Sequence, residues 1–156
     1  MLPKAHEIAE IFYEAFIIKD AQTMANLYDP KASFSDEVFL NLSGIEAGAM
    51  WRMLCSGSKD LRLTYEILES SENVAMIKWH AYYTFSKTGR TVHNIITTKL
   101  TTSKGKIMSQ HDHFSFWNWS KQAFGPLGVL LGWTPILKNK VRGEALRSLS
   151  KFMNRI

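Results

Sequence analysis

The spacing of apolar residues changes once along the chain. Up to residue 57 apolar residues mostly recur every three or four positions, which is the period of an amphipathic helix. From residue 61 to residue 119 they alternate with polar residues, which is the period of a half-buried strand. This order of helices followed by long strands predicts an α+β fold.

Three helices are predicted in the first part. The first follows Pro3, and its apolar residues are Ile8, Ile11, Phe12, Ala15 and Phe16. The second begins after Asp20, a good N-cap residue, and ends before Asp29 and Pro30. The third begins at the Ser43–Glu46 capping box and ends at Gly57. A short strand over 32–36 is predicted between the second and third helices.

Four longer strands are predicted after residue 60, and alternation assigns their faces. They cover Leu61–Glu69, Val74–Ser86, Thr91–Thr102 and Ile107–Trp119. On the strand over 74–86, the residues predicted to face inward are Ala75, Ile77, Trp79, Ala81, Tyr83 and Phe85. On the strand over 91–102, they are Val92, Asn94, Ile96, Thr98 and Leu100. Four histidines fall on the outward faces: His80, His93, His111 and His113. His111 and His113 share a face, but two histidines form only part of a metal site, and no metal is predicted.

The last part of the chain differs in composition. Residues 124–133 are rich in glycine and too short to cross a membrane. Thr134 and Pro135 then begin a final helix. Its apolar face is Val141, Ala145, Leu149, Phe152 and Ile156.

Composition and charge narrow the function classes. With 156 residues, 46% hydrophobic and 21% charged, the chain fits one globular domain. Residues 1–120 hold 12 basic and 13 acidic residues, whereas 121–156 hold seven and one, so the net charge of +5 lies in the C-terminal segment. Nucleic-acid binding is therefore not predicted. The single Cys55 forms no internal disulfide, and Glu7 and Glu10 interrupt any N-terminal signal sequence, so a cytoplasmic location is predicted.

Three helices followed by a meander of long strands resemble the nuclear transport factor 2-like superfamily, which includes ketosteroid isomerase, limonene epoxide hydrolase, scytalone dehydratase and SnoaL-like polyketide cyclases. The resemblance lies in FYEAFIIKDAQTMANLYDPKASFSDEVF (12–39), SGIEAGAMWRML (43–54) and GKIMSQHDHFSFW (105–117). It implies a cone-shaped, curved, mixed or antiparallel sheet around the N-terminal helices, enclosing a pocket for hydrophobic substrates. Residues 1–120 would form this domain, and the basic helical extension 121–156 would pack on it.

The resemblance also implies candidate catalytic residues. Asp36 matches the general-base aspartate of ketosteroid isomerase. The oxyanion-hole tyrosine of that enzyme matches Phe12, and its oxyanion-hole aspartate falls near Thr97 or Thr98, so steroid isomerisation itself is not expected. On the last strand the resemblance turns Met108, Gln110, Asp112, Phe114 and Phe116 inward. The position of Asp112 is similar to that of the acid/base residue of SnoaL-like cyclases.

We therefore predict an isomerase, hydrolase or lyase that uses Asp36 and Asp112 without a cofactor. The predicted pocket is lined by Phe12, Trp51, Tyr83 and Phe114, with Asn94 and Gln110 as orienting groups. Burial should raise the pKa of at least one aspartate, while the other, better hydrogen-bonded, stays ionised and acts as the base. Structural roles remain open: Asp112 as a hydrogen-bond acceptor, Asp36 as a turn cap. Tyr13, Tyr28 and Trp51 are predicted as core or pocket wall rather than as hydrogen-bond donors.

Two further surfaces carry predictions. The outward sheet face is predicted to form a homodimer interface through His80, Tyr82, His111, His113 and Trp117. The basic C-terminal segment is predicted to be a lid over the pocket, in preference to a contact with anionic membrane. The alternative to an enzyme is a non-catalytic module that binds a hydrophobic ligand or dimerises, with membrane association through this segment.

Overall fold

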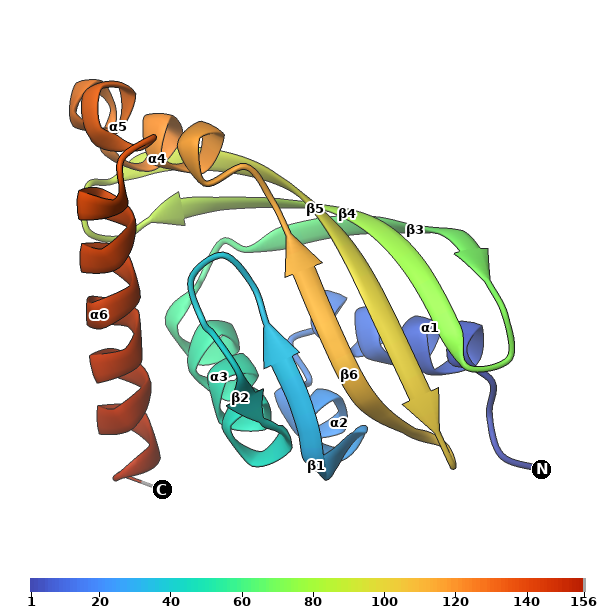
Figure 1. The fold of residues 1–156 in the computed structure, drawn as a ribbon. Helices are drawn as coiled ribbons and strands as arrows, with labels where there is room; N and C mark the ends of the chain where they lie inside the picture. Colours follow the sequence, from blue (N-terminus) through green and yellow to red (C-terminus); the bar gives the residue numbers. More distant parts are fainter. Residues whose placement is uncertain (156) are drawn as a thin grey trace.

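A curved six-stranded sheet wraps around helices in the computed structural model, which describes residues 1–155 (Figure 1). The helices are α1 (Ala5–Ile17), α2 (Ala21–Asn26), α3 (Gly44–Gly57), α4 (Phe116–Phe124), α5 (Pro126–Leu131) and α6 (Pro135–Met153). The strands are β1 (Tyr28–Ser35), β2 (Leu42–Ser43), β3 (Arg62–Ser70), β4 (Val74–Phe85), β5 (Arg90–Ser103) and β6 (Lys106–His113). Helices α1–α3 fill the concave side, and α6 stands across its open end. The predicted α+β cone is confirmed.

The strand order, β2-β1-β6-β5-β4-β3, makes the sheet mixed. All neighbours are antiparallel except β1 and β6, which run parallel with Ser35 opposite His111. Parallel strands bring their carboxyl ends to the same edge of a sheet. The residue that follows β1, Asp36, therefore lies near Asp112 although 76 positions separate them in the sequence.

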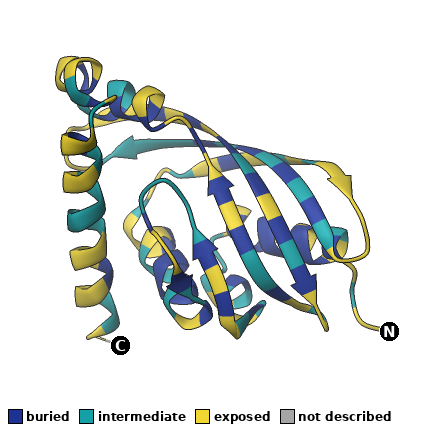
Figure 2. Ribbon diagram, in the orientation of Figure 1, coloured by how far each residue is buried: buried dark blue, intermediate teal, exposed yellow. Residues whose placement is uncertain are grey.

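The predicted inward faces of the middle strands are confirmed, and buried and exposed residues alternate along them (Figure 2). The exception lies in β6, where Met108 is partly exposed and Ile107 is fully buried. Thr101 pairs with Ser109 but Thr102 pairs with Ile107, so Met108 is the extra residue of a bulge. The bulge reverses the side-chain alternation at this point, and the inward placement of Met108 was wrong.

The predicted helix starts are confirmed by their caps. The Asp20 carboxylate accepts a bond from the Thr23 amide at 3.1 Å and caps α2. The Ser43 hydroxyl accepts from the Glu46 amide at 3.1 Å, and the Glu46 carboxylate accepts from the Ser43 amide at 2.9 Å, which completes the capping box of α3. In α1, however, Ile11 is 44% exposed and lies outside the buried stripe.

The last strand is shorter than predicted. β6 ends at His113, and the Ser115 hydroxyl accepts a bond from the Asn118 amide at 3.2 Å to cap α4. The alternating Phe114 and Phe116 fit a strand, but the buried residues after Phe116 recur at helical spacing. Trp117 consequently lies on α4 and not on the sheet face proposed for dimerisation.

The C-terminal helix α6 begins at Pro135, as predicted. The Thr134 hydroxyl donates to the Leu131 carbonyl and does not cap the helix. Leu137 and Leu149 are buried, and Val141 and Ala145 are partly buried against the core. Ile156, the last position of the predicted apolar face, lies outside the described residues. Within residues 1–155, none of the helices combines the length and the hydropathy of a membrane span.

Candidate active site

A cavity of about 440 Å³ lies between the sheet and helices α3, α4 and α6. Its wall is mainly apolar and includes Met50, Trp51, Ile96, Phe114 and Trp119. Helix α6 contributes part of the wall through Val141 and Ala145. The basic C-terminal segment is thus part of the cavity's enclosure.

Asp36 and Asp112 both line this cavity. Asp112 projects from the concave face of β6 and is 3% exposed. Asp36 enters from the loop after β1, at the edge where β1 and β6 end together. The topology therefore brings the two predicted carboxyl groups into one site.

Two donors hold one oxygen of Asp112. Oδ1 accepts from the Thr98 hydroxyl at 2.7 Å and from the Gln110 side-chain amide at 3.2 Å. The Thr98 oxygen itself accepts from the Trp79 indole N–H at 2.9 Å and from the Tyr13 hydroxyl at 3.2 Å. Because both acceptor positions of Thr98 are taken, its own proton points to Asp112.

A second chain of bonds orients Gln110. The Trp51 indole N–H donates to the Tyr28 hydroxyl at 2.8 Å, and Tyr28 donates to the Gln110 carbonyl oxygen at 2.5 Å. This arrangement turns the Gln110 NH₂ group toward Asp112. Tyr13, Tyr28 and Trp51 are therefore hydrogen-bond donors, which corrects the prediction that they only fill the core or the wall. Burial also raises the pKa of both tyrosines well above the usual value, so both stay protonated.

The second oxygen of Asp112 is left for the cavity. Residues 1–155 supply no hydrogen bond to Oδ2 and contain no solvent-inaccessible side-chain polar atom without a partner, so Oδ2 opens onto the cavity. Burial raises the pKa of Asp112 to about 7, the bond from Thr98 lowers it, and the nearby charge of Asp36 raises it. Near neutral pH this group is therefore ready to gain or lose a proton.

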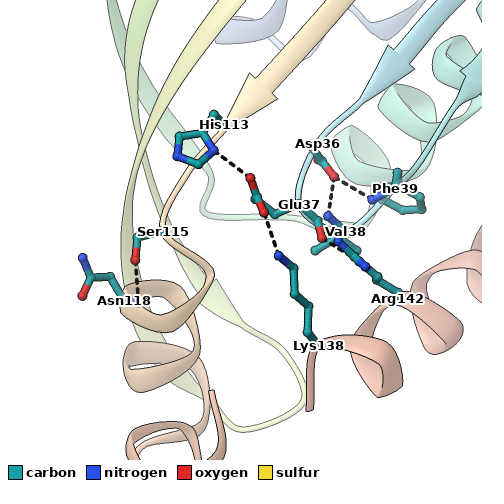
Figure 3. A network of polar contacts seen from close by, with 9 residues as sticks. All are labelled: Asp36, Glu37, Val38, Phe39, His113, Ser115, Asn118, Lys138 and Arg142. Carbon is teal, nitrogen blue, oxygen red and sulfur yellow. Dashed lines mark hydrogen bonds and ion pairs between the residues drawn. The ribbon is translucent and has the colours of Figure 1, made fainter. Parts of the chain in front are cut away.

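Asp36 is held by its own loop. Its Oδ1 accepts from the backbone amides of Val38 and Phe39 at 2.7 and 2.6 Å (Figure 3). Burial raises the pKa of Asp36 to about 6, although these two bonds oppose the rise. The pKa of both aspartates is thus raised, as predicted for at least one of them, and Asp36, with the lower value, stays largely ionised near neutral pH.

Helix α6 is attached to this loop through Glu37. The Glu37 carboxylate contacts Lys138 Nζ at 2.9 Å and His113 Nδ1 at 2.7 Å, and its backbone carbonyl accepts from Arg142 Nε at 2.9 Å (Figure 3). His113 thus contacts an acidic residue on the loop. No group of three potential metal ligands occurs within the described chain.

Two polar side chains complete the wall. Asn94 is 8% exposed, lines the cavity and makes no side-chain hydrogen bond with residues 1–155, so its amide faces the cavity. The Tyr83 hydroxyl accepts from the Trp119 indole N–H at 2.7 Å. The described residues offer the Tyr83 proton no acceptor, which leaves it available to a ligand.

Two predicted substrate-binding residues do not line the cavity. Phe12 is fully buried in the core, with its ring centroid 5.5 Å from that of Trp51. Gln110 lies behind the wall and reaches the cavity only through Asp112. Sequence reasoning missed Thr98 as the donor to Asp112. Its only signal was a hydroxyl residue on the inward face of an apolar strand.

A curved mixed sheet wrapped around helices is the cone fold of nuclear transport factor 2-like proteins. Residues 9–110 match the SnoaL-like domain, and the chain belongs to this family. Among proteins of curated function, none matches the sequence significantly.

Solved structures share the fold at low sequence identity. A ketosteroid isomerase-like protein from Catenulispora acidiphila, solved with trimethylamine, has a TM-score of 0.65 at 17% identity, with 86% of this chain and 100% of that chain covered. A candidate polyketide cyclase from Pseudomonas putida has a TM-score of 0.67 at 15% identity, covering 78% and 98%. An LEH-like epoxide hydrolase from Mycobacterium tuberculosis has a TM-score of 0.59 at 13% identity, covering 80% and 92%. At these identities the likeness establishes the fold alone.

Proposed function

We propose that this protein is a small-molecule enzyme that uses general acid–base catalysis to isomerise, hydrate or hydrolyse a hydrophobic substrate. Membership of the SnoaL-like family supports a role as an enzyme or as a ligand-binding protein, without specifying the reaction. One observation carries the finer proposal: two carboxyl groups open onto the same apolar cavity, and one oxygen of Asp112 is free to reach a ligand.

The two carboxyl groups divide the proton transfers by their pKa values. Asp36, with the lower value of about 6, is largely ionised at neutral pH and acts as the base. Asp112, with a value of about 7, retains a substantial protonated fraction and acts as the acid through Oδ2. In isomerisation, Asp36 removes a proton from an activated C–H group and Asp112 protonates a second atom. In hydration or hydrolysis, Asp36 takes the proton of an attacking water while Asp112 protonates the substrate oxygen.

The lining of the cavity suits a substrate that has a large apolar body and an oxygen-containing group. A cavity of about 440 Å³ falls in the range of small-molecule sites, which is about 300–1,000 Å³. The Tyr83 hydroxyl and the Asn94 amide are the donors available to bind a carbonyl, hydroxyl or epoxide oxygen. A hydroxyl in a largely apolar wall also penalises substrates that lack an acceptor.

The test begins with mass spectrometry of small molecules that co-purify with the chain, followed by assays on hydrophobic epoxides, enones and polyketide-like ketones. We expect Asp36→Asn and Asp112→Asn each to lower turnover by about 10²–10⁴-fold. Asp29→Asn, in β1 and outside the cavity wall, should leave turnover unchanged.

Two results would overturn the proposal. Normal turnover by both cavity variants would show that these carboxyl groups are not catalytic. Retention of an apolar ligand by the native chain with no turnover across the panel would instead establish the alternative, a non-catalytic binding module.

A further inference from the structure

Five large apolar side chains project into solvent at one corner of the molecule. They are Leu127, Val129, Leu130, Trp133 and Ile136, which are 49%, 47%, 68%, 72% and 73% exposed. We call this group the α5 cluster. It occupies half of a ten-residue segment, which is a high density of exposed apolar surface for a folded domain.

The packing of α5 against α4 directs these side chains toward solvent. A Cβ atom on Gly128 would lie 1.9 Å from the Ser120 carbonyl oxygen, and one on Gly132 would lie 1.9 Å from the Ser120 hydroxyl oxygen. Helix α5 therefore rests on α4 through Gly128 and the Gly132 that follows it, and the side chains of Leu127, Val129 and Leu130 face away. The Trp117 indole N–H also donates to the Val129 carbonyl at 3.3 Å. The exposed cluster is thus a result of close helix packing.

A basic surface continues from the cluster along α6. Ile136, Lys140, Arg147 and Lys151 are exposed, and their spacing places them within about 60° of one another around the helix axis. Residues 121–156 contain seven basic residues and one acidic residue. Figure 2 shows exposed residues along α5 and along α6 on the outside of the molecule. The inner face of α6 meanwhile lines the cavity.

We propose that the α5 cluster and the outer face of α6 bind the surface of an anionic lipid bilayer. Leucine, isoleucine and tryptophan side chains suit the boundary between headgroups and acyl chains, and lysine and arginine attract anionic headgroups. A second copy fits this surface poorly, because two-fold pairing would set the basic faces of both copies together. The binding is peripheral, since α6 lacks the hydropathy of a membrane span.

The α5 cluster and the outer face of α6 are separate from the carboxyl groups of the cavity, so their binding to a bilayer does not depend on the proposed reaction. Binding to a bilayer would, however, determine where the cavity lies relative to the membrane. Because α6 lines the cavity with its inner face and carries part of this surface on its outer face, bound protein would hold its apolar cavity beside the bilayer, where hydrophobic molecules accumulate.

The test is sedimentation of the full chain with large unilamellar vesicles of phosphatidylcholine, with and without phosphatidylserine. We expect binding that requires phosphatidylserine and weakens with salt. A Leu130→Asp/Trp133→Asp variant should lose this binding and keep the native melting temperature, because both residues are exposed. Leu68→Asp is the matched control: Leu68 is 52% exposed and lies at the end of β3 far from α5, so its binding should be native.

Charge variants test the other half of the surface. Replacing Lys140, Arg147 and Lys151 by glutamine should lower the vesicle partition coefficient by about fivefold for each residue. The proposal is overturned if native protein does not sediment with anionic vesicles or if the Leu130→Asp/Trp133→Asp variant binds like the native chain. It is also overturned if that variant lowers the particle mass in light scattering, which would assign the cluster to contact between two copies.

Discussion

Thr98 and Asp112 lie directly opposite each other on β5 and β6, and their side chains are joined by a hydrogen bond of 2.7 Å. The register of two regular strands, and not a loop, therefore sets the geometry of the buried carboxyl group. The other two bonds to Thr98 come from α1 and β4, so three elements converge on one hydroxyl. This placement suits a carboxyl group that must stay in position while it exchanges protons.

Thr98→Val tests this contact. Valine keeps the shape of threonine but leaves the Trp79 and Tyr13 donors buried without an acceptor, so we expect a loss of about 1–3 kcal/mol in the free energy of unfolding. The pKa of Asp112 should also rise, because the bond from Thr98 lowers it. Urea unfolding and carboxyl NMR titration measure the two effects. Thr97→Val, on the opposite face of the same strand, should change neither, and a comparable loss there would contradict the assignment.

The raised pKa values of Asp36 and Asp112 predict that stability falls as pH rises. In the unfolded chain an aspartate ionises near pH 4, whereas the folded groups hold their protons to about pH 6 and pH 7. Between these values the folded state binds more protons, so each group lowers stability with rising pH until its folded pKa is passed. Below about pH 4 both groups are protonated in the folded and the unfolded chain, so this loss of stability is absent.

Asp112→Asn isolates this effect, because the asparagine carbonyl still accepts the bonds from Thr98 and Gln110. We expect the variant to gain stability over the native chain by about 1.4 kcal/mol per pH unit between pH 4 and pH 7. Urea unfolding at several pH values measures this difference. A difference that stays constant with pH would show that the folded carboxyl group ionises normally.

Leu149 tests the role of α6 as a packed wall. It is 1% exposed, so Leu149→Ala should lower the free energy of unfolding by about 2–5 kcal/mol. Leu146→Ala on the same helix should change it by less than about 0.5 kcal/mol, because Leu146 is 51% exposed. Deletion of residues 121–156 should also lower the melting temperature. Equal effects of the two alanine variants would mean that α6 is not anchored through this face.

Glu37 tests the attachment of α6 to the loop of Asp36. Partial burial raises the pKa of Glu37, but its contacts with Lys138 and His113 lower the pKa overall, so its contribution is present above the unfolded value and is lost as pH falls through the folded one. Glu37→Gln should speed amide hydrogen exchange in the first turns of α6. Glu144→Gln breaks only the exposed contact with Lys87, so its effect should be smaller. The opposite order would contradict the role of Glu37.

The outer sheet face remains a predicted homodimer interface. Tyr82 stacks on His93 at 4.3 Å, and the Arg62 guanidinium lies 5.5 Å above the Tyr82 ring, which gives this face a flat aromatic surface. Light scattering should return twice the chain mass of 17.9 kDa at high micromolar concentration. Tyr82→Asp should return the single mass, whereas Leu130→Asp should not. A native particle of a single mass would refute the interface.

Local sequence patterns predicted the structure correctly where a residue's environment depends on its near neighbours in the chain. The capping box at Ser43, the start of α6 at Pro135 and the inward faces of β4 and β5 follow from hydrogen bonds and side-chain periods within one element. The strand–helix boundary after β6 was the weak point. Phe114 and Phe116 fit the period of a strand, and only the Ser115 cap and the buried Trp119, three residues after Phe116, indicate that a helix has begun.

By itself, the sequence determined the α+β order, the alternating faces of the middle strands and the presence of an acidic residue on an apolar strand. The family resemblance led to the prediction that Asp36 and Asp112 share a cavity, but only the tertiary structure established it, because the shared position depends on the parallel pairing of β1 with β6 across most of the chain. The tertiary structure also decided that Phe12 belongs to the core and that Tyr13, Tyr28 and Trp51 act as donors. The physical reason is that a hydrogen-bond partner or a cavity wall is supplied by a distant element that packs against the residue. The spacing of residues within one element does not indicate which distant element that is.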